Sequence, residues 1–291
     1  MTLDVSSINV IKMINDSSPT TMDANLRIDT GSMGGETEES RSSLCLHWVI
    51  GGEGTGHHAL RHAFDRYLKR PDVLDKGPHY PLWVRMWDAH LPRLPRKAIQ
   101  GAFRSLVAQY CASGVRAIFE DTSFPYGGVG NVWSRFASPK SRRGPLRRPD
   151  IAEMLRLLEG LPMKILVLHR SPILTVNSTL SRGFSSDLQF EAELAETTHQ
   201  YIAEQVGSLP ESSYRTLAFE RLVEDPLTCL KALAQWWEID ETHAAEGAEK
   251  IRKPTSLNEV SEDRLRFLEQ YFSEEKRLRW DSVYQNNSLV S

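Results

Sequence analysis

The stretch of chain that decides the fold runs from residue 44 to residue 68 and reads LCLHWVIGGEGTGHHALRHAFDRYL. Its opening part, residues 44–50, is the largely apolar run typical of a buried strand. Residues 51–56 are rich in glycine, and residues 57–68 then place apolar side chains at helical spacing. The stretch therefore predicts a strand, a glycine-rich loop and a helix in succession.

The same alternation continues along the rest of the chain. Helices are predicted at 97–113, 150–160, from Ser171-Pro172, at 189–206, from Asp225-Pro226 through 237 and from 261, and strands at 115–119, 164–168 and 214–219. Such alternation is typical of a parallel sheet that is covered on both faces and binds ligands at the carboxyl ends of its strands. We expect a single α/β domain over residues 41–291, with a central parallel sheet, helices on both faces and a phosphate-binding loop after the first strand. The polar residues 1–40 are predicted to be a loosely ordered tail.

Composition narrows the class of protein. The chain has 291 residues, 40% of them hydrophobic, and a net charge of -3, which disfavours a basic nucleic-acid groove or attachment to an anionic membrane. Cys45, Cys111 and Cys229 each lie in an apolar stretch that suits a buried thiol, and three scattered cysteines predict no disulfide framework. Since neither a membrane span nor a signal peptide is recognisable, we expect a cytoplasmic protein.

The loop at 51–58 has the glycine spacing of a phosphate-binding loop, in which small residues let backbone N–H groups face an anion. Magnesium-ATP chemistry requires Lys and then Ser or Thr after the last glycine, whereas this chain has His57 and His58. One alternative is a turn that only joins strand to helix. Another is a zinc pair formed by His58 and His62, although the Glu of a metallopeptidase helix is missing between them.

Three segments, in order, resemble the sulfotransferases. Residues 49–61 are similar to the family's first signature, V-I-G-x-P-[RK]-S-G-T-T-L-L-R. Residues 165–172, ILVLHRSP, with Ser178 eight positions after Arg170, look like the family's strand whose Arg and Ser bind a 3'-phosphate. Residues 214–226 are similar to the family's structural segment Y-x-x-L-x-Y-E-x-L-x-x-D-P.

The resemblance implies a P-loop-like fold and transfer of a sulfuryl group to a hydroxyl or amine of a small molecule, without a metal. The implied donor is 3'-phosphoadenosine 5'-phosphosulfate (PAPS), held by the loop and by Arg170 and Ser178. An Arg at a strand end offers a fixed fork of donors to such an anion. The loop residues expected to contact it are Gly52, Glu53, Gly54, Thr55, Gly56, His57 and His58. Arg252 and Lys253 resemble a late R-K-G loop that also holds the 3'-phosphate, although the glycine is absent.

The chain departs from the family at the position that carries a cation. Gly54 stands where the family has Lys or Arg, and His57 and His58 stand where it has paired hydroxyls. Charge that develops during sulfuryl transfer requires a donor or a cation. We therefore expect His57 or His58 to supply it.

Two segments of the sequence compete for the role of general base. Glu120 and Asp121 lie in a stretch similar to the F-E-K-S segment of carbohydrate sulfotransferases, and His90 lies in one similar to the K-T-H-L-P segment of cytosolic sulfotransferases. A capping or salt-bridge role for the two carboxylates stays open. So do two other functions: a nucleotide or small-molecule kinase, and a nucleotide-binding protein without turnover. A homodimer is also left open.

Overall fold

The computed structural model describes residues 44–75, 95–124, 151–158, 160–183, 186–251, 257–285 and 287–290. The predicted tail, residues 1–40, lies outside these ranges. The strands are β1 (Cys45–Gly52), β2 (Val73–Asp75), β3 (Ala117–Phe124), β4 (Met163–His169) and β5 (Tyr214–Ala218). The α-helices are α2 (His57–Ala63), α3 (Asp65–Leu68), α5 (Arg96–Ala112), α8 (Ile151–Leu157), α9 (Pro172–Ser181), α10 (Leu188–Gly207), α11 (Phe219–Glu224), α12 (Pro226–Trp237), α13 (Thr242–Ala248), α14 (Glu262–Tyr271) and α15 (Glu274–Gln285).

The described strands form one parallel sheet in the order β2-β3-β1-β4-β5. Strand β1 therefore lies between β3 and β4. From β1 the chain first builds the β2-β3 side of the sheet and then the β4-β5 side. The end of β1 is thus the point at which the strand order reverses, where open α/β sheets bind their ligands. The predicted fold class, an α/β protein with a central parallel sheet and a loop after the first strand, is confirmed.

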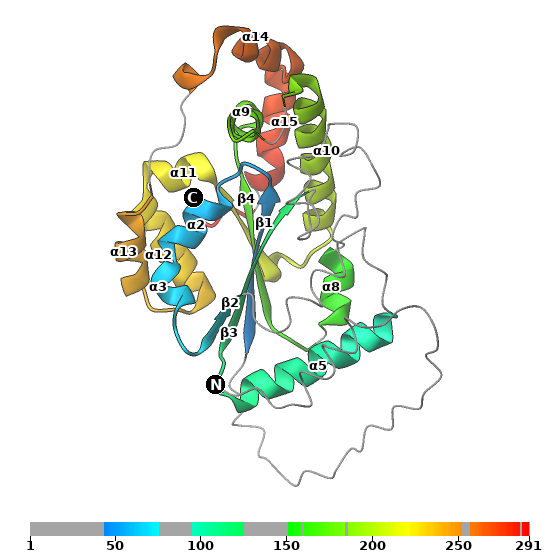
Figure 1. Ribbon diagram of the computed structural model, residues 1–291, viewed down its shortest axis with the longest axis vertical. Helices are drawn as coiled ribbons and strands as arrows, with labels where there is room; N and C mark the ends of the chain where they lie inside the picture. The colour runs from blue at the N-terminus through cyan, green and yellow to red at the C-terminus, as the bar shows by residue number, and fades with distance from the viewer. Residues whose placement is uncertain are drawn as a thin grey trace. The chain divides into compact units, whose positions relative to one another are not determined.

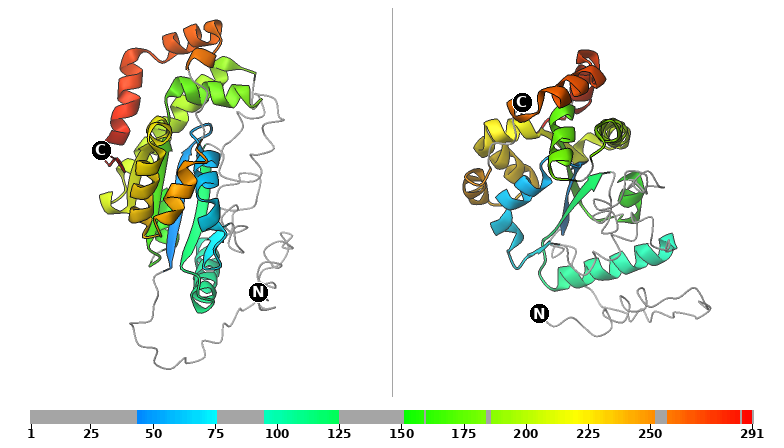
Figure 2. Two further views of the ribbon diagram at one scale, coloured as in Figure 1. Left: turned by 90° about the vertical axis from the view of Figure 1, so that its left-hand side faces the viewer. Right: turned by 45° about the horizontal axis from the view of Figure 1, so that its top comes forward.

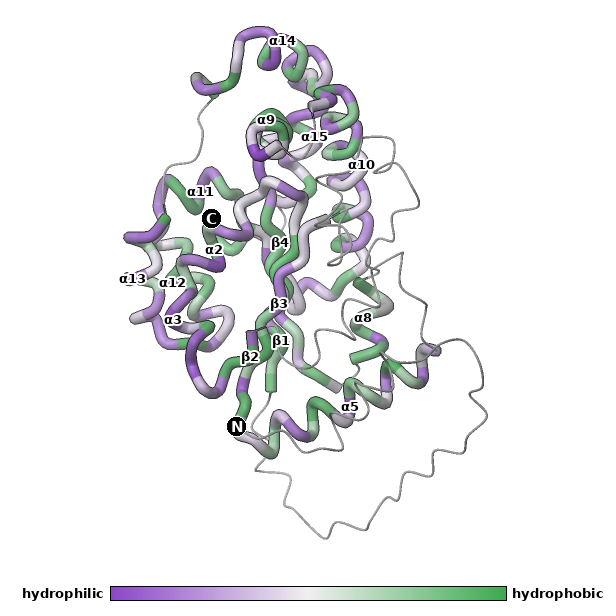
Figure 3. Tube along the Cα trace, in the orientation of Figure 1, coloured by the Kyte–Doolittle hydropathy of each residue, from purple (hydrophilic) through white to green (hydrophobic). Residues whose placement is uncertain are grey.

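Helices cover both faces of the sheet. Successive side chains of a strand point to opposite faces, and those of β1 and β4 are mostly buried, so both faces must be covered. Helices α2, α3, α12 and α13 lie on one face, and α5, α8 and α10 lie on the other (Figures 1 and 2). Val49, Phe119 and Leu166 belong to the core under α2 and α12. Trp48, one residue away, points to the opposite face and donates its Nε1–H to Thr122 Oγ1 at 2.9 Å. The strands are mostly hydrophobic along their length, whereas α14 is mostly hydrophilic (Figure 3).

A segment close to the C-terminus pairs with the outer strand of the sheet. The Thr216 N–H of β5 donates to the Asn287 carbonyl at 2.9 Å, and the Leu289 N–H donates to the Thr216 carbonyl at 2.8 Å. The Thr216 hydroxyl also donates to the Tyr284 carbonyl of α15 at 2.5 Å. These bonds attach Tyr284, Asn287 and Leu289 to the outer side of β5.

Several local predictions differ from the structure. The pattern at 57–68 forms two helices, because the backbone leaves the helical conformation at Phe64 (ψ 15°). The pattern from 261 also divides, because Phe272 (ψ 77°) ends α14 and Ser273 then accepts from the Lys276 N–H at the start of α15. Ser171 precedes α9 as predicted but makes no side-chain cap.

One cysteine prediction is wrong. Cys111 is exposed, Cys45 is half-buried and Cys229 is buried. Helix α5 buries Ile99, Phe103 and other residues at intervals of three and four, and position 111 falls off that face. None of the helices in the described ranges is long and apolar enough to cross a bilayer. The cytoplasmic location stays a prediction.

Candidate functional site

The loop between β1 and α2 is held in a fixed shape by its own residues. Gly54 and Gly56 have φ values of +88° and +105°, a region that L side chains rarely adopt. The Thr55 hydroxyl donates to the Gly52 carbonyl at 2.7 Å, and the Thr55 N–H points to the same carbonyl at 3.3 Å. The Thr55 side chain thus closes the turn instead of reaching outward.

The neighbouring elements leave no room for side chains at the two glycines. A Cβ at Gly54 would lie 2.9 Å from the Thr175 carbonyl oxygen of α9 and 3.4 Å from Ser178 Cβ. A Cβ at Gly56 would overlap the ring of Phe219. Residue 54 cannot carry a Lys or Arg while α9 packs this closely, which accounts physically for the missing loop cation.

A cleft of about 330 Å³ opens beside the loop. It is lined by residues from four separate parts of the sequence: Glu53, Gly54, Gly56, His57, His58, Ser123, Arg170, Ser178, Arg182 and Phe219. Arg170 follows the end of β4 and Ser178 lies on α9, so the two predicted anion-binding side chains share one cleft with the loop. Gly52 and Thr55 do not line it.

Arg170 is fixed against the loop and is only 4% exposed. Its Nη1–H donates to the Gly54 carbonyl at 3.2 Å, and its guanidinium lies 5.2 Å from the centre of the Phe219 ring. The Glu220 carboxylate lies 4.0 Å from Arg170 Nε and also accepts from the Ser171 N–H at 3.0 Å. Burial lowers the pKa of Arg170, and the nearby Glu220 charge opposes that shift.

A second arginine, which no sequence motif marks, also lines the cleft. Arg182 follows the last residue of α9, one turn beyond Ser178, and its Nη1 lies 3.3 Å from Glu53 Oε1. The Arg182 side chain is 37% exposed and that of Glu53 is 18% exposed. The ion pair thus joins α9 to the loop at the border of the cleft.

The two loop histidines differ in their surroundings. His57 is 5% exposed, and burial lowers its pKa to about 4 despite the opposing charge of Asp121. His57 is therefore neutral near pH 7 and can act there only as a neutral donor or acceptor. His58 is exposed in the cleft.

The candidate carboxylates lie on β3 but do not line the cleft. Glu120 is fully buried at the register position of Trp48, on the face of the sheet opposite α2. Asp121 points toward α2 and accepts from Arg61 Nη1 at 3.3 Å. Ser123, further along the strand, does reach the cleft. His90, Arg252 and Lys253 lie outside the described residues, so their roles stay predictions.

A second pocket of about 290 Å³ adjoins the cleft. Its lining residues come mostly from α2 and α3: His58, Arg61, His62, Asp65, Leu68, Lys69 and Asp75. Arg61 is paired with both Asp75 and Asp121. His58 is the residue that lines both the cleft and the pocket.

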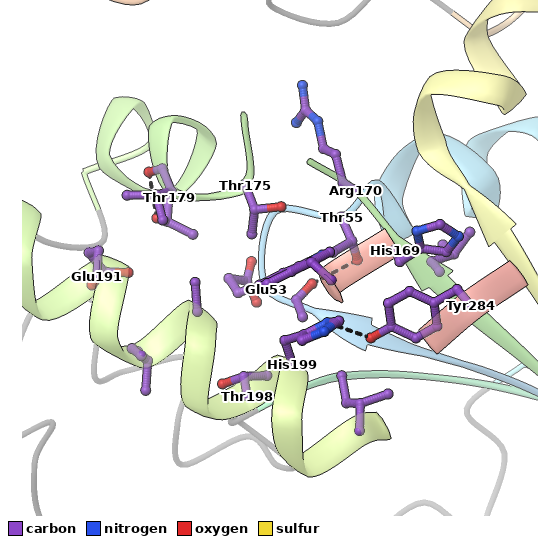
Figure 4. Close-up of a pocket in the computed structure, with 17 residues that line it drawn as sticks. Glu53, Thr55, His169, Arg170, Thr175, Thr179, Glu191, Thr198, His199 and Tyr284 are labelled. Atoms are coloured by element: carbon purple, nitrogen blue, oxygen red, sulfur yellow. Dashed lines mark hydrogen bonds between the residues drawn. The ribbon is translucent and has the colours of Figure 1, made fainter. Parts of the chain in front are cut away.

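A small cavity of about 30 Å³ also borders the loop (Figure 4). Thr55 and Glu53 line it together with residues of α9, α10 and α15. His199 is stacked on Trp280 at 3.7 Å between ring centres, and its Nδ1 lies 2.9 Å from the Tyr284 hydroxyl. Burial lowers the pKa of His199 to about 3. The cavity has the volume of one or two water molecules and is too small for a nucleotide.

The residues that the structure describes include no group of three or more His, Cys, Asp or Glu side chains that could hold a metal ion. His58 and His62 therefore have no third ligand of that kind among them.

The fold and the cleft define an α/β protein with a phosphate-loop type of turn at the switch point of its sheet. No family model matches the chain, and no curated protein sequence matches it. A sulfotransferase from Alicyclobacillus acidocaldarius is similar in structure, with 11% identity and a TM-score of 0.48 over 83% of this chain and 96% of that one.

Two further solved structures are similar. The sulfotransferase domain of the Synechococcus PCC 7002 olefin synthase has 15% identity and a TM-score of 0.42, over 84% of this chain and 90% of that one. The sulfotransferase domain from the curacin biosynthetic pathway has 12% identity and a TM-score of 0.36, over 78% and 96% of the two chains. All three structures are described as sulfotransferases or sulfotransferase domains. Likeness at this level assigns no role to any residue.

Proposed function

We propose that this protein is a PAPS-dependent sulfotransferase that acts on a hydroxyl or amine of a small molecule. One observation carries the proposal: the loop after β1 lines a single cleft together with Arg170 and Ser178, which follow it by more than a hundred residues in the sequence. The volume of the cleft, about 330 Å³, falls at the lower end of the range for small-molecule sites, roughly 300–1,000 Å³.

The side chains of the cleft fit an anionic nucleotide. Arg170 and Arg182 bring two guanidinium groups to it, in a chain whose net charge is -3. Arg170, whose position is fixed by Gly54 and Glu220, would hold the 3'-phosphate together with the Ser178 hydroxyl. The loop N–H groups and the first turn of α2 would face the 5'-phosphosulfate, because the first N–H groups of a helix have no acceptor within it.

The acceptor would occupy the second pocket, which meets the cleft at His58. In the reaction a bond forms from the acceptor oxygen or nitrogen to sulfur, and the bond from sulfur to the 5'-phosphate oxygen breaks. The electron pair stays on that oxygen, and the acceptor proton is taken by a base. His58, which lines both spaces, would take it.

Titration calorimetry tests the nucleotide site directly. Adenosine 3',5'-bisphosphate should bind the wild-type protein, and ATP with magnesium should bind much more weakly, because the loop has no magnesium hydroxyl. Arg170→Ala should bind the bisphosphate more weakly, and Arg279→Ala, which removes an ion pair with Glu275 on the surface of α15, is the control that should bind it like the wild type. Tighter binding of magnesium-ATP than of the bisphosphate would favour the kinase alternative.

Turnover is tested with sulfur-labelled PAPS and a panel of phenols, alcohols and amines. Label should move to at least one acceptor in that panel. Binding of the bisphosphate without transfer to any acceptor would favour the alternative of a nucleotide-binding protein without turnover.

A further inference from the structure

The loop of this protein has a deficit of positive charge. Gly54 cannot bear a cationic side chain, because its φ is +88° and the Thr175 carbonyl occupies the space of a Cβ. Glu53 adds a negative charge next to it. His57 is neutral near pH 7. Yet sulfuryl transfer leaves a developing negative charge on the oxygen between sulfur and phosphorus, and a fixed cation or donor there is usually the largest catalytic contribution.

Helix α9 brings a guanidinium to the same loop from outside it. The Arg182 N–H donates to the Ser178 carbonyl at 3.2 Å, so the two residues lie one turn apart along α9. Both line the cleft, and Gly54 packs against Ser178 and Thr179 of the same helix. Arg182 therefore lies at the end of the helix that packs against Gly54, and its side chain lines the same cleft as the loop.

Arg182 and Arg170 have different neighbours in the cleft. Its Nη1 lies 3.3 Å from Glu53 Oε1. Its charge also contributes to the lowered pKa of His57, the residue that begins α2. Arg170, in contrast, is fixed against Gly54 and Glu220. The two arginines thus line one cleft with different partners, Gly54 and Glu220 for Arg170 and Glu53 for Arg182.

We propose that Arg182 is the catalytic cation of this enzyme, supplied by α9 in place of the missing loop Lys or Arg, and that Glu53 is the residue that positions it. This inference rests on the proposed function. When the donor binds, the guanidinium would donate to the sulfuryl and 5'-phosphate oxygens, on which the electron pair of the broken bond collects. No proton is transferred to or from Arg182, since guanidinium stays charged in proteins.

The test separates the two ends of the nucleotide by using two ligands. Adenosine 3'-monophosphate lacks the 5'-phosphate that Arg182 would contact, whereas adenosine 3',5'-bisphosphate has it. Arg182→Ala should weaken bisphosphate binding about ten- to a hundredfold, roughly the worth of one charge-assisted bond, and change monophosphate binding less than twofold. Arg170→Ala should weaken both ligands to a similar degree.

Turnover provides the second readout. Arg182→Ala should lower kcat at least a hundredfold, Arg182→Lys should recover part of the loss, and Arg279→Ala should match the wild type. Glu53→Gln should lower kcat by less, and adding it to Arg182→Ala should cost nothing more, because the residue that it positions is already gone. Thermal unfolding of each variant checks that the fold is kept.

The outcomes are distinguishable. If the wild type binds neither ligand, the proposed function itself fails. If the wild type binds both but Arg182→Ala loses the two ligands equally, or keeps kcat within threefold, the proposed function stands and the role of Arg182 is refuted.

Discussion

Replacing Gly54 by Ala tests whether the positive φ of residue 54 and its contact with α9 exclude a side chain from the loop. A non-glycine residue in the left-handed region costs roughly 1–2 kcal/mol. Forcing a methyl group to within 2.9 Å of the Thr175 carbonyl adds a term like that of an overpacked core, about 1–3 kcal/mol. The expected loss in the free energy of unfolding is therefore about 2–5 kcal/mol, or a melting temperature lower by roughly 5–20 °C for a domain of this size.

Two other glycines serve as controls for the separate causes. Gly52→Ala should change the free energy of unfolding by less than about 0.5 kcal/mol, because its nearest neighbours lie 3.6 and 3.8 Å from a Cβ and its φ is ordinary. Gly114 has a φ of +77° and open space where a Cβ would lie, so Gly114→Ala should show only the cost of placing an L residue in the left-handed region. Urea unfolding of the three variants gives the free energies. If Gly54→Ala is as stable as Gly114→Ala, the contact with α9 is not as tight as described and the explanation for the missing cation is wrong.

Three other measurements follow from the site. Arg170→Ala should weaken binding of adenosine 3',5'-bisphosphate by about 1.5–3 kcal/mol, the worth of a hydrogen bond to a charged group, and unchanged affinity in calorimetry would remove Arg170 from the site. The free energy of unfolding should fall as pH drops from about 6.5 toward 4, because His57 and His199 have pKa values lowered to about 4 and about 3 by burial, so the unfolded chain binds their protons first. His57→Gln should flatten that slope in urea titrations at pH 5, 6 and 7.5, and an equal slope in the variant would show that His57 does not contribute. Turnover should be unchanged in excess chelator, and activity that disappears in chelator and returns with one metal would contradict the metal-free mechanism.

The local sequence was sufficient to predict those elements whose structure depends on a single segment of the chain. The apolar run ending at Gly51, the glycines that follow, and the spacing of Arg170 and Ser178 each placed their elements correctly. Asp225 was also recognisable as a helix cap, and its carboxylate accepts from the Thr228 N–H at 3.2 Å. These features depend on neighbours a few residues away, which the sequence shows directly.

The remaining features depend on which face of an element packs against which partner. Glu120 and Asp121 are adjacent in sequence, but alternation along β3 sends one to each face of the sheet and neither to the cleft. The pairing of Glu53 with Arg182 spans more than a hundred residues, and no local pattern marks Arg182 as special. The reason for glycine at position 54 is likewise a tertiary one, because it lies in the packing of α9.

The bonds between β5 and residues 287–289 have a consequence for how the molecule behaves at high concentration. A strand with an open side offers a row of N–H and carbonyl groups on which a strand of another molecule can add. Here Thr216, in the middle of β5, already has both of its backbone groups occupied by Asn287 and Leu289. Deleting residues 287–290 would free that row, so the shortened protein should self-associate as its concentration rises, which light scattering would detect, even though every residue of the cleft is unchanged.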